Sequence, residues 1–493
     1  MLIAAHEWSL PYIAKHTAHQ NSVFGLTPAA LSTGELASLY SRLTQGQPDT
    51  ALRAEAAGFL QQQLAKVAFQ PRELPDSPDD LEVWMQGLAQ RATSQYSAYL
   101  EQRKSGGPRH YFTNRAHALY FLRSVGPTKL VDGAWLYGLV KHWRNPRFEG
   151  LVRTYVEELG EGDPDKNHVL LYRRLLARYN LNLGDKLADG FYAQGLIQLA
   201  LAYNAEEFLP ELIGFNLGYE QLPLHLLITA YELNELGLDP YYFTLHLTVD
   251  NADTGHARRA VQAALDTLPR LGNTQDFWRR MQLGCQLGSV GIGTTDVIDG
   301  FDIEQEVVRI FSHKSGAGRG AHSDYCRVAG LSVNNWLAQP DQIPAFLDAL
   351  QQTGWIKRGA AAHQSRFWGY LQGRSAEMFG VFSSYELQLV HDWIRGPASS
   401  DGQAYSEPSL PEGRTRRASF RAAEKLAIFK TPRLQSGLQD TETLDPDLQT
   451  LNLQLKELDE SGQEKLLLDA LSPSLHWTPM GLQATRLFCQ RVW

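Results

Sequence analysis

Apolar residues recur at helical spacing along most of the chain. Between 28 and 104, the stretch TPAALSTGELASLYSRL has a capping Thr or Ser ahead of an apolar pattern of helical period, and residues 79–103 repeat that pattern. From 110 to 270 one such segment follows another, without the alternating pattern and Asn-Gly turns that are typical of strands. We therefore predict an all-α protein whose core is a helical bundle.

Breaks in this pattern divide the chain into five regions. KSGGP at 104–108 ends an N-terminal helical region, and glycine-rich stretches begin after the bundle. A segment rich in Pro, Ser and Gly is expected to be a linker or a mobile loop, and the chain beyond it is helical again. The predicted regions are 1–109 (additional N-terminal helices), 110–270 (bundle core), 271–395 (glycine-rich loops and helices packing on the core), 396–417 (linker) and 418–493 (C-terminal helical extension).

The glycine-rich stretches GSVGIG and SGAGRG lack the context of nucleotide-binding loops. The first follows no strand pattern and opens no βαβ unit, and the second lacks the Gly-Lys-Ser/Thr ending of a phosphate loop. We interpret both as loops. The segment 312–326 is a candidate lid or substrate-binding loop.

Composition excludes several classes of partner. The 493 residues carry 46 basic and 54 acidic side chains, a net charge of −8, and no basic block that would follow a nucleic acid backbone. No stretch approaches the roughly 20 apolar residues of a membrane span, and the N-terminus has no signal-peptide pattern, so we predict a cytoplasmic protein. Three scattered cysteines cannot form a thiolate metal site. Any metal must therefore be held by His and carboxylate side chains. The sequence is also compatible with a homodimer.

Three segments place such side chains on predicted apolar helix faces, where an unpaired charge is costly. The first is Asp132 in KLVDGAWL. The second is the turn in EELGEGDPDKNH, where Glu158 ends one helix and His168 begins the next. The third is HLTVDNADTGHA, in which His246 and Asp250 stand at i and i+4 on one helical face.

His256 fits this third segment only if the helix is interrupted. It lies ten residues after His246, which in a regular helix leaves it roughly 80° off the shared face. The backbone would have to unwind between Asn251 and Gly255 to bring it back. The sequence thus ties the use of His256 to a helix break.

Each segment also has a purely structural interpretation. Asp132 could cap a helix, and Glu157 and Glu158 could form a solvated helix end. His168 could begin a helix without binding anything, and His246 with Asp250 could be a simple hydrogen-bonded pair. No single segment decides between a ligand and a structural role.

Taken together and in this order, the three segments resemble the haem-oxygenase-like di-iron oxidases, a family of iron-containing redox enzymes. The resemblance covers roughly 110–265 and extends to NLGYEQLP and YELNELGLDPYY. It implies a ligand set of Asp132, Glu158, His168, His246, Asp250 and His256. Asp253 is the alternative for the last position, and Glu220 and Glu232 are further candidate carboxylates with structural hydrogen bonding as their alternative role.

The resemblance also implies the cofactors and the reaction. It implies two Fe(II) ions per chain, with O2 as co-substrate, and no catalytic residue beyond the ligands. Such enzymes oxidise a small organic substrate, amino-acid-like or fatty-acid-like, by N-oxygenation, desaturation or C–C cleavage. Two alternatives remain: a haem-oxygenase-like protein with one metal or none acting on a small cofactor precursor, and a non-catalytic helical binding scaffold.

Overall fold

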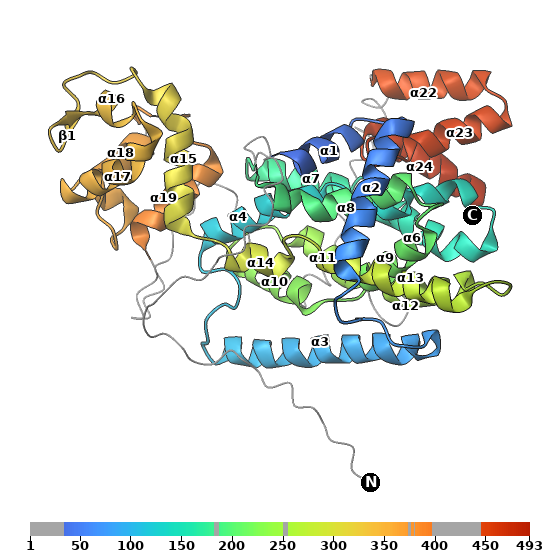
Figure 1. Ribbon diagram of the computed structural model, residues 1–493. Coiled ribbons are helices and arrows are strands. Elements are labelled where there is room, and N and C mark those ends of the chain that lie inside the picture. The colour runs from blue at the N-terminus through green and yellow to red at the C-terminus, as the bar shows by residue number, and fades with distance from the viewer. Residues whose placement is uncertain (1–33, 182–186, 250–254, 373–375, 379, 397–444) are drawn as a thin grey trace, which may run out of the picture.

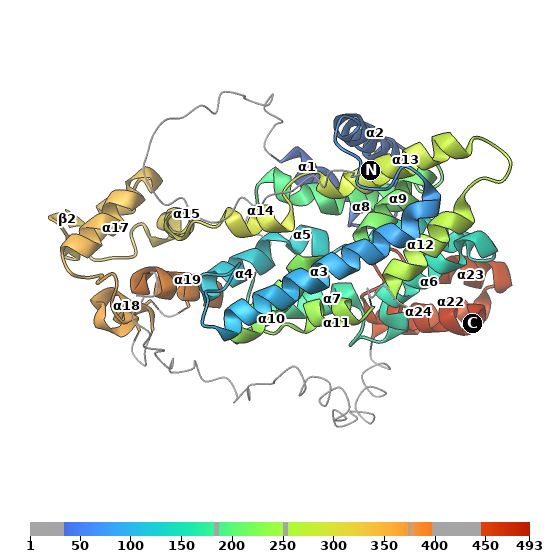
Figure 2. The ribbon, with the colours of Figure 1, turned by 90° about the horizontal axis from the view of Figure 1, so that it is seen from below.

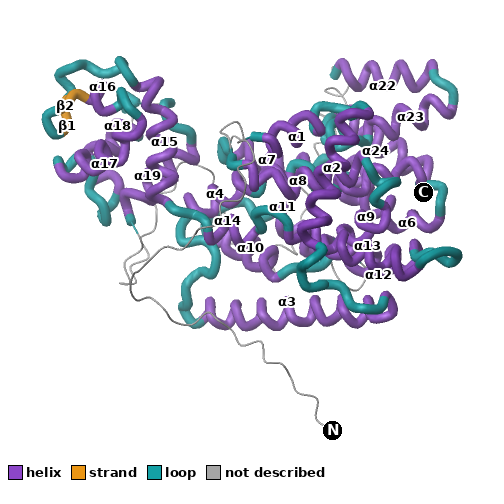
Figure 3. The backbone as a smooth tube through the Cα atoms, viewed as in Figure 1, coloured by secondary structure: helices purple, strands orange, loops and turns teal. Residues whose placement is uncertain are grey.

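The computed structural model is helical almost throughout the residues that it describes, which confirms the predicted all-α class (Figures 1 and 3). The described residues are 34–181, 187–249, 255–372, 376–378, 380–396 and 445–493. Within them the only strands are β1 (Arg327–Val328) and β2 (Leu331–Ser332), which pair as a short antiparallel hairpin. None of the described helices is long and apolar enough to cross a membrane.

Three N-terminal helices cover the bundle from outside. They are α1 (Glu35–Leu43), α2 (Thr50–Val67) and α3 (Leu81–Lys104). The side chain of Asp49 caps α2 by accepting a hydrogen bond from the Leu52 amide at 2.8 Å. The long helix α3 runs across α10 (Leu224–Glu235) and α12 (His256–Thr267), and it ends where KSGGP begins (Figures 1 and 2). These helices shield the bundle from solvent on two sides.

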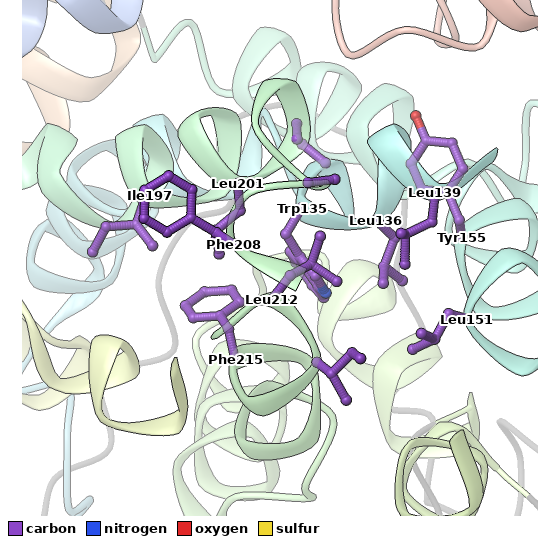
Figure 4. Close-up of a cluster of buried hydrophobic side chains, with 14 of the residues drawn as sticks. Trp135, Leu136, Leu139, Leu151, Tyr155, Ile197, Leu201, Phe208, Leu212 and Phe215 are labelled. Carbon is purple, nitrogen blue, oxygen red and sulfur yellow. The ribbon is translucent and has the colours of Figure 1, made fainter. Parts of the chain in front are cut away.

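The bundle consists of short helices that pack around a buried apolar cluster. Its other α-helices are α4 (Arg115–Ser124), α5 (Gly126–Lys129), α6 (Glu149–Glu158), α7 (His168–Arg178), α8 (Ala193–Tyr203), α9 (Leu209–Tyr219), α11 (Tyr241–Val249) and α13 (Thr274–Gln286). Its 3-10 segments are η2 (Ala134–His142), η3 (Pro146–Phe148), η4 (Gly160–Gly162), η5 (Asp189–Tyr192) and η6 (Leu287–Ser289). Trp135 of η2 lies at the centre of the cluster, edge-on to Phe215 at 5.4 Å between ring centroids (Figure 4).

Helices α9 and α13 approach so closely that glycine is required at their contact. A Cβ atom at Gly214 would lie 1.8 Å from the carbonyl oxygen of Met281, and one at Gly284 would lie 2.0 Å from that of Glu211. Any side chain at either position would force the two backbones apart.

A second lobe extends from one end of the bundle (Figures 1 and 2). Its helices are α15 (Ile303–Gly318), α16 (Val333–Trp336), α17 (Ile343–Gln352), α18 (Arg366–Leu371) and α19 (Ser384–Arg395), with the 3-10 segments η7 (Pro340–Gln342) and η8 (Ala362–Gln364); α14 (Thr294–Asp299) leads into it. A buried ion pair of 3.3 Å between Arg123 of α4 and Glu306 of α15 joins this lobe to the bundle, and Tyr385 donates to the same carboxylate.

The prediction that SGAGRG forms a loop is wrong for the first half of this stretch. Helix α15 continues through Gly318, so Ser315 and the residues up to Gly318 are helical, and only the stretch from Arg319 onwards is irregular. Packing of Val307, Ile310 and Phe311 against α17 and α19 overrides the low helix propensity of the two glycines. Apart from Gly396, the expected linker lies outside the described residues.

Three C-terminal helices pack on the bundle beside α6. They are α22 (Pro446–Glu457), α23 (Glu460–Ala470) and α24 (Pro479–Val492). Leu467, Leu471 and Phe488 are buried in the same apolar cluster as Leu151 and Tyr155 of α6. The C-terminal helices therefore share one core with the bundle.

Candidate metal centre

Six buried side chains form two overlapping groups inside the bundle. Asp132, Glu158, His168 and His246 make up the first group, and Glu158, Glu220 and His256 make up the second. Within each group the ligand-capable atoms lie within 4.8 Å of one another. We call Asp132, His168 and His246 the first half-site, and Glu220 with His256 the second half-site; Glu158 belongs to both.

Asp132 enters the first half-site from a tight turn between α5 and η2. It is 3% exposed, and it does not cap η2, whose N-cap is Gly133. Gly133 is left-handed (φ 77°), and a Cβ atom there would lie 2.8 Å from Cβ of Glu158. Trp135 fixes the start of η2 because its indole donates to Asn216 Oδ1 at 3.0 Å. The turn thus presses Asp132 against the helix that carries Glu158.

Glu158 and His168 stand at the two ends of the turn between α6 and α7. Helix α6 ends at Glu158 because the following backbone becomes left-handed at Gly160, Glu161 and Gly162. Helix α7 begins at His168, and Asn167 caps it by accepting from the Leu170 amide at 2.9 Å. A chain reversal of nine residues therefore brings the two side chains face to face, with 2.5 Å between His168 Nδ1 and Glu158 Oε2.

His246 and His256 lie on separate helices. Helix α11 ends at Val249, and α12 begins at His256 after the N-cap Gly255. His246 turns its Nε2 towards Asp132 Oδ2 at 3.0 Å, while its ring lies 4.2 Å from that of His168. The backbone at Gly255 is extended (φ −84°, ψ −164°), so α12 starts at His256, and the side chain of His256 is buried in the bundle rather than turned to solvent. Asp250 and Asp253 lie outside the described residues.

His256 and Glu220 build the second half-site on the other side of Glu158. His256 Nδ1 lies 3.2 Å from Glu158 Oε1 and 3.2 Å from Glu220 Oε2. Glu220 reaches this place from the C-cap of α9. The two oxygens of Glu158 therefore face different half-sites, Oε2 the first and Oε1 the second. A carboxylate in this arrangement can bridge two metal ions.

Glu232 takes the structural role. It accepts hydrogen bonds from the Tyr99 hydroxyl at 2.8 Å and from the Phe112 amide at 2.8 Å, and it anchors the chain ahead of α4 to α10. It belongs to neither group of metal-ligating atoms.

Two further side chains orient the ligands and were missed by the sequence analysis. Glu157 Oε2 lies 3.0 Å from His256 Nε2, so Nε2 donates to Glu157 and Nδ1 turns its lone pair inwards. The Tyr242 hydroxyl donates to Asp132 Oδ2 at 2.5 Å, and its backbone carbonyl accepts from His246 Nδ1 at 2.8 Å. Tyr242 precedes His246 by one helical turn, and this spacing is the only feature of the sequence that indicates its role.

Lys129 adds a buried positive charge beside the first half-site. Its Nζ lies 3.6 Å from Asp132 Oδ1 and donates to the Tyr219 hydroxyl at 3.4 Å. Burial alone raises the pKa of Asp132, but Lys129 and His246 outweigh burial and lower that pKa to about 2. Burial likewise raises the pKa of Glu158, yet His168 and His256 hold it well below its usual range. Both carboxylates are therefore ionised.

The donor set fits two metal ions of the iron type. Asp132 Oδ1 and His168 Nδ1 are buried and make no hydrogen bond of good geometry with the described residues. Three buried carboxylates face a single lysine, and so much buried negative charge is costly unless cations compensate it. Imidazole nitrogens with carboxylate oxygens are the ligands that iron accepts readily.

One comparison with known proteins agrees with this donor set. Residues 119–289 match the family model of the iron-containing redox enzymes. This segment contains Asp132, Glu158, His168, Glu220, His246 and His256. Neither the curated proteins nor the solved structures gave a significant match.

Proposed function

We propose that this chain, whose residues 119–289 match the family model of the iron-containing redox enzymes, is a non-haem di-iron oxidase or oxygenase. It would use O2 to oxidise a small organic substrate. The observation that carries the proposal is Glu158, which presents one oxygen to each of two groups of buried nitrogen and oxygen donors. Asp132, His168 and His246 would hold one ion, and Glu220 and His256 the other.

The ions, when bound, would supply electrons to dioxygen from two adjacent centres. The residues of the chain contribute placement, charge balance and exclusion of water. All six ligating side chains are at most 7% exposed, so the bundle keeps bulk water from the ions. Tyr242 holds Asp132 by a hydrogen bond to Oδ2, the oxygen that also faces His246. Glu157 holds His256 through Nε2, on the side away from Nδ1, which faces Glu158 and Glu220.

The proposal also covers the remaining metal ligand and the substrate class. Asp250 follows α11 directly and would complete the first half-site. Asp253 is the alternative to His256 for the last ligand. The placement of His256 against Glu158 and Glu220 supports His256 as a ligand in its own right. The substrate class is amino-acid-like or fatty-acid-like, and the reaction is an N-oxygenation, a desaturation or a C–C cleavage.

The test is anaerobic loading of the purified protein with Fe(II), followed by oxygen. We expect two irons per chain and a change in visible absorption on addition of O2. Uptake of a single iron would favour a mononuclear site, and no uptake would leave a binding scaffold. Glu206→Gln serves as the matched control, because Glu206 is an exposed carboxylate whose partners, Lys141 and His142, lie outside both half-sites. It should load as the unmodified protein does.

A further inference from the structure

The C-terminal helices contact the turn that joins Glu158 to His168. Arg486 of α24 donates from Nε to the carbonyl oxygen of Gly162 at 3.0 Å. The approach is so close that a Cβ atom at Gly162 would lie 2.4 Å from the carbonyl oxygen of Leu482. One helical turn before the α6–α7 turn, the Tyr155 hydroxyl donates to the Leu471 carbonyl at 2.5 Å. These contacts come from outside the segment that matches the family.

Asn167 joins three parts of the chain through one amide group. Its Oδ1 caps α7. Its Nδ2 lies 3.2 Å from the carbonyl oxygen of Leu159, 3.2 Å from His476 Nδ1 and 3.3 Å from the His476 carbonyl oxygen. Leu159 follows Glu158 directly, and Asn167 directly precedes His168. The amide therefore ties the backbone beside one ligand to the backbone beside the other, and ties both to the C-terminal segment.

His476 lies in the connection between α23 and α24 and is 2% exposed. Burial, as the largest cause, lowers its pKa to about 3, so the imidazole is neutral and its Nδ1 can accept from Asn167. The next residue, Trp477, stacks on the guanidinium of Arg173, with 3.6 Å between Cζ and the ring centroid. Arg173 belongs to α7, so the connection also contacts the helix that begins with His168.

We propose that the segment 471–486 holds the α6–α7 turn in its metal-binding form, and that Asn167 and His476 are the positioning residues through which it acts. Glu158 and His168 sit at opposite ends of a turn with three left-handed residues, and one of these, Glu161, is not a glycine, so its conformation needs support from its surroundings. Hydrogen bonds to the flanking backbone supply that support, and they set the metal affinity without touching a ligand. The inference rests on the metal site of the proposed function.

Three variants test the proposal with Co2+ alone as the probe. Asn167→Ser keeps an oxygen for the cap of α7 but removes Nδ2, and His476→Leu removes the acceptor. His476→Asn restores an acceptor close to the position of Nδ1. By equilibrium dialysis we expect Co2+ affinity to fall about 10- to 100-fold in the first two variants and to stay near that of the unmodified protein in His476→Asn. The visible Co2+ bands should shift in the first two variants only.

A double variant and a control separate positioning from general stability. Asn167→Ser with His476→Leu should lose no more affinity than Asn167→Ser alone, because Asn167→Ser already removes the side-chain contact that His476→Leu breaks. Glu464→Gln weakens another contact of the same helices, the ion pair with Arg144, and should lower Tm slightly while leaving Co2+ affinity and spectrum unchanged.

The possible outcomes distinguish failure of the proposed function from failure of the positioning role. If the unmodified protein takes up no metal, the proposed function fails and this inference with it. If it loads two ions while Asn167→Ser keeps the same affinity and spectrum, the inference alone is overturned. If Glu464→Gln weakens Co2+ as much as Asn167→Ser does, the effect is general stability, and the positioning role is refuted. Should His476→Leu fail to fold, Asn167→Ser decides by itself, because its cap is preserved.

Discussion

The two half-sites contain the same kinds of ligand but are held in place differently. In the first, Asp132 is contacted by Lys129 and Tyr242, both of which are enclosed by the bundle. In the second, His256 is oriented by Glu157, which also accepts hydrogen bonds from Arg259 at 2.7 Å and from Arg153 at 2.9 Å. The first half-site thus depends on buried contacts, and the second depends on a network that reaches the surface.

This difference has an energetic consequence. The side chain of Arg153 is 38% exposed and that of Glu157 is 24% exposed, so water and salt screen their attraction. The ion pair of Lys129 and Asp132 is hardly exposed and is screened much less. We therefore expect the second half-site to bind its ion more weakly than the first, and to lose more of its affinity at high ionic strength.

The largest effect is expected from the shared carboxylate. Glu158→Ala removes one oxygen from each half-site and should reduce bound iron from two ions per chain to nearly none. The measurement is iron content after anaerobic loading, with far-ultraviolet circular dichroism to show that the helices persist. Retention of one firmly bound ion in this variant would mean that Glu158 does not bridge.

Removing one histidine from each half-site should separate the two ions. His246→Ala should release the ion of the first half-site and His256→Ala that of the second, so each variant keeps about one iron per chain. Iron titration of the two variants side by side checks this expectation. The ion left in His246→Ala, bound by the second half-site, should be the weaker one and should dissociate more readily in added salt.

The smallest effects should come from residues that contact a proposed ligand but offer no ligand atom themselves. Glu157→Gln removes the charge that orients His256 and should weaken the second ion about tenfold, at the low end for such contacts. Tyr242→Phe removes one hydrogen bond to Asp132, but Lys129 and His246 still hold that carboxylate, so the first ion should weaken by less. Stepwise Fe(II) titrations measure both. An equal loss in the two variants would contradict the difference between the half-sites.

The sequence predicted the structure best where local rules determine it. Helical periodicity predicted the fold class, and the turn signals between Glu158 and His168 predicted how α6 and α7 meet. The angular argument for His256 required a helix break, and α11 and α12 are indeed separate helices. These features follow from spacing along the chain alone.

Contacts between distant parts of the chain were beyond the reach of the sequence. Glu220 and Glu232 both sit in apolar surroundings, and only the fold shows that the first faces His256 while the second binds backbone amides. Glu157 appeared as half of a solvated pair until α12 brought His256 and Arg259 against it. The role of His476 depends on a contact across 309 positions of the sequence.

One glycine next to the first ligand limits how this sequence can vary. At Gly133 the backbone is left-handed, and a side chain would collide with Glu158. Even alanine would push the two ligand-bearing segments apart, although position 133 contributes no ligand atom. Homologues that retain a glutamate at position 158 should therefore vary freely around this turn but keep glycine after the aspartate. The dipeptide Asp-Gly is for that reason a better marker for finding them than the aspartate by itself.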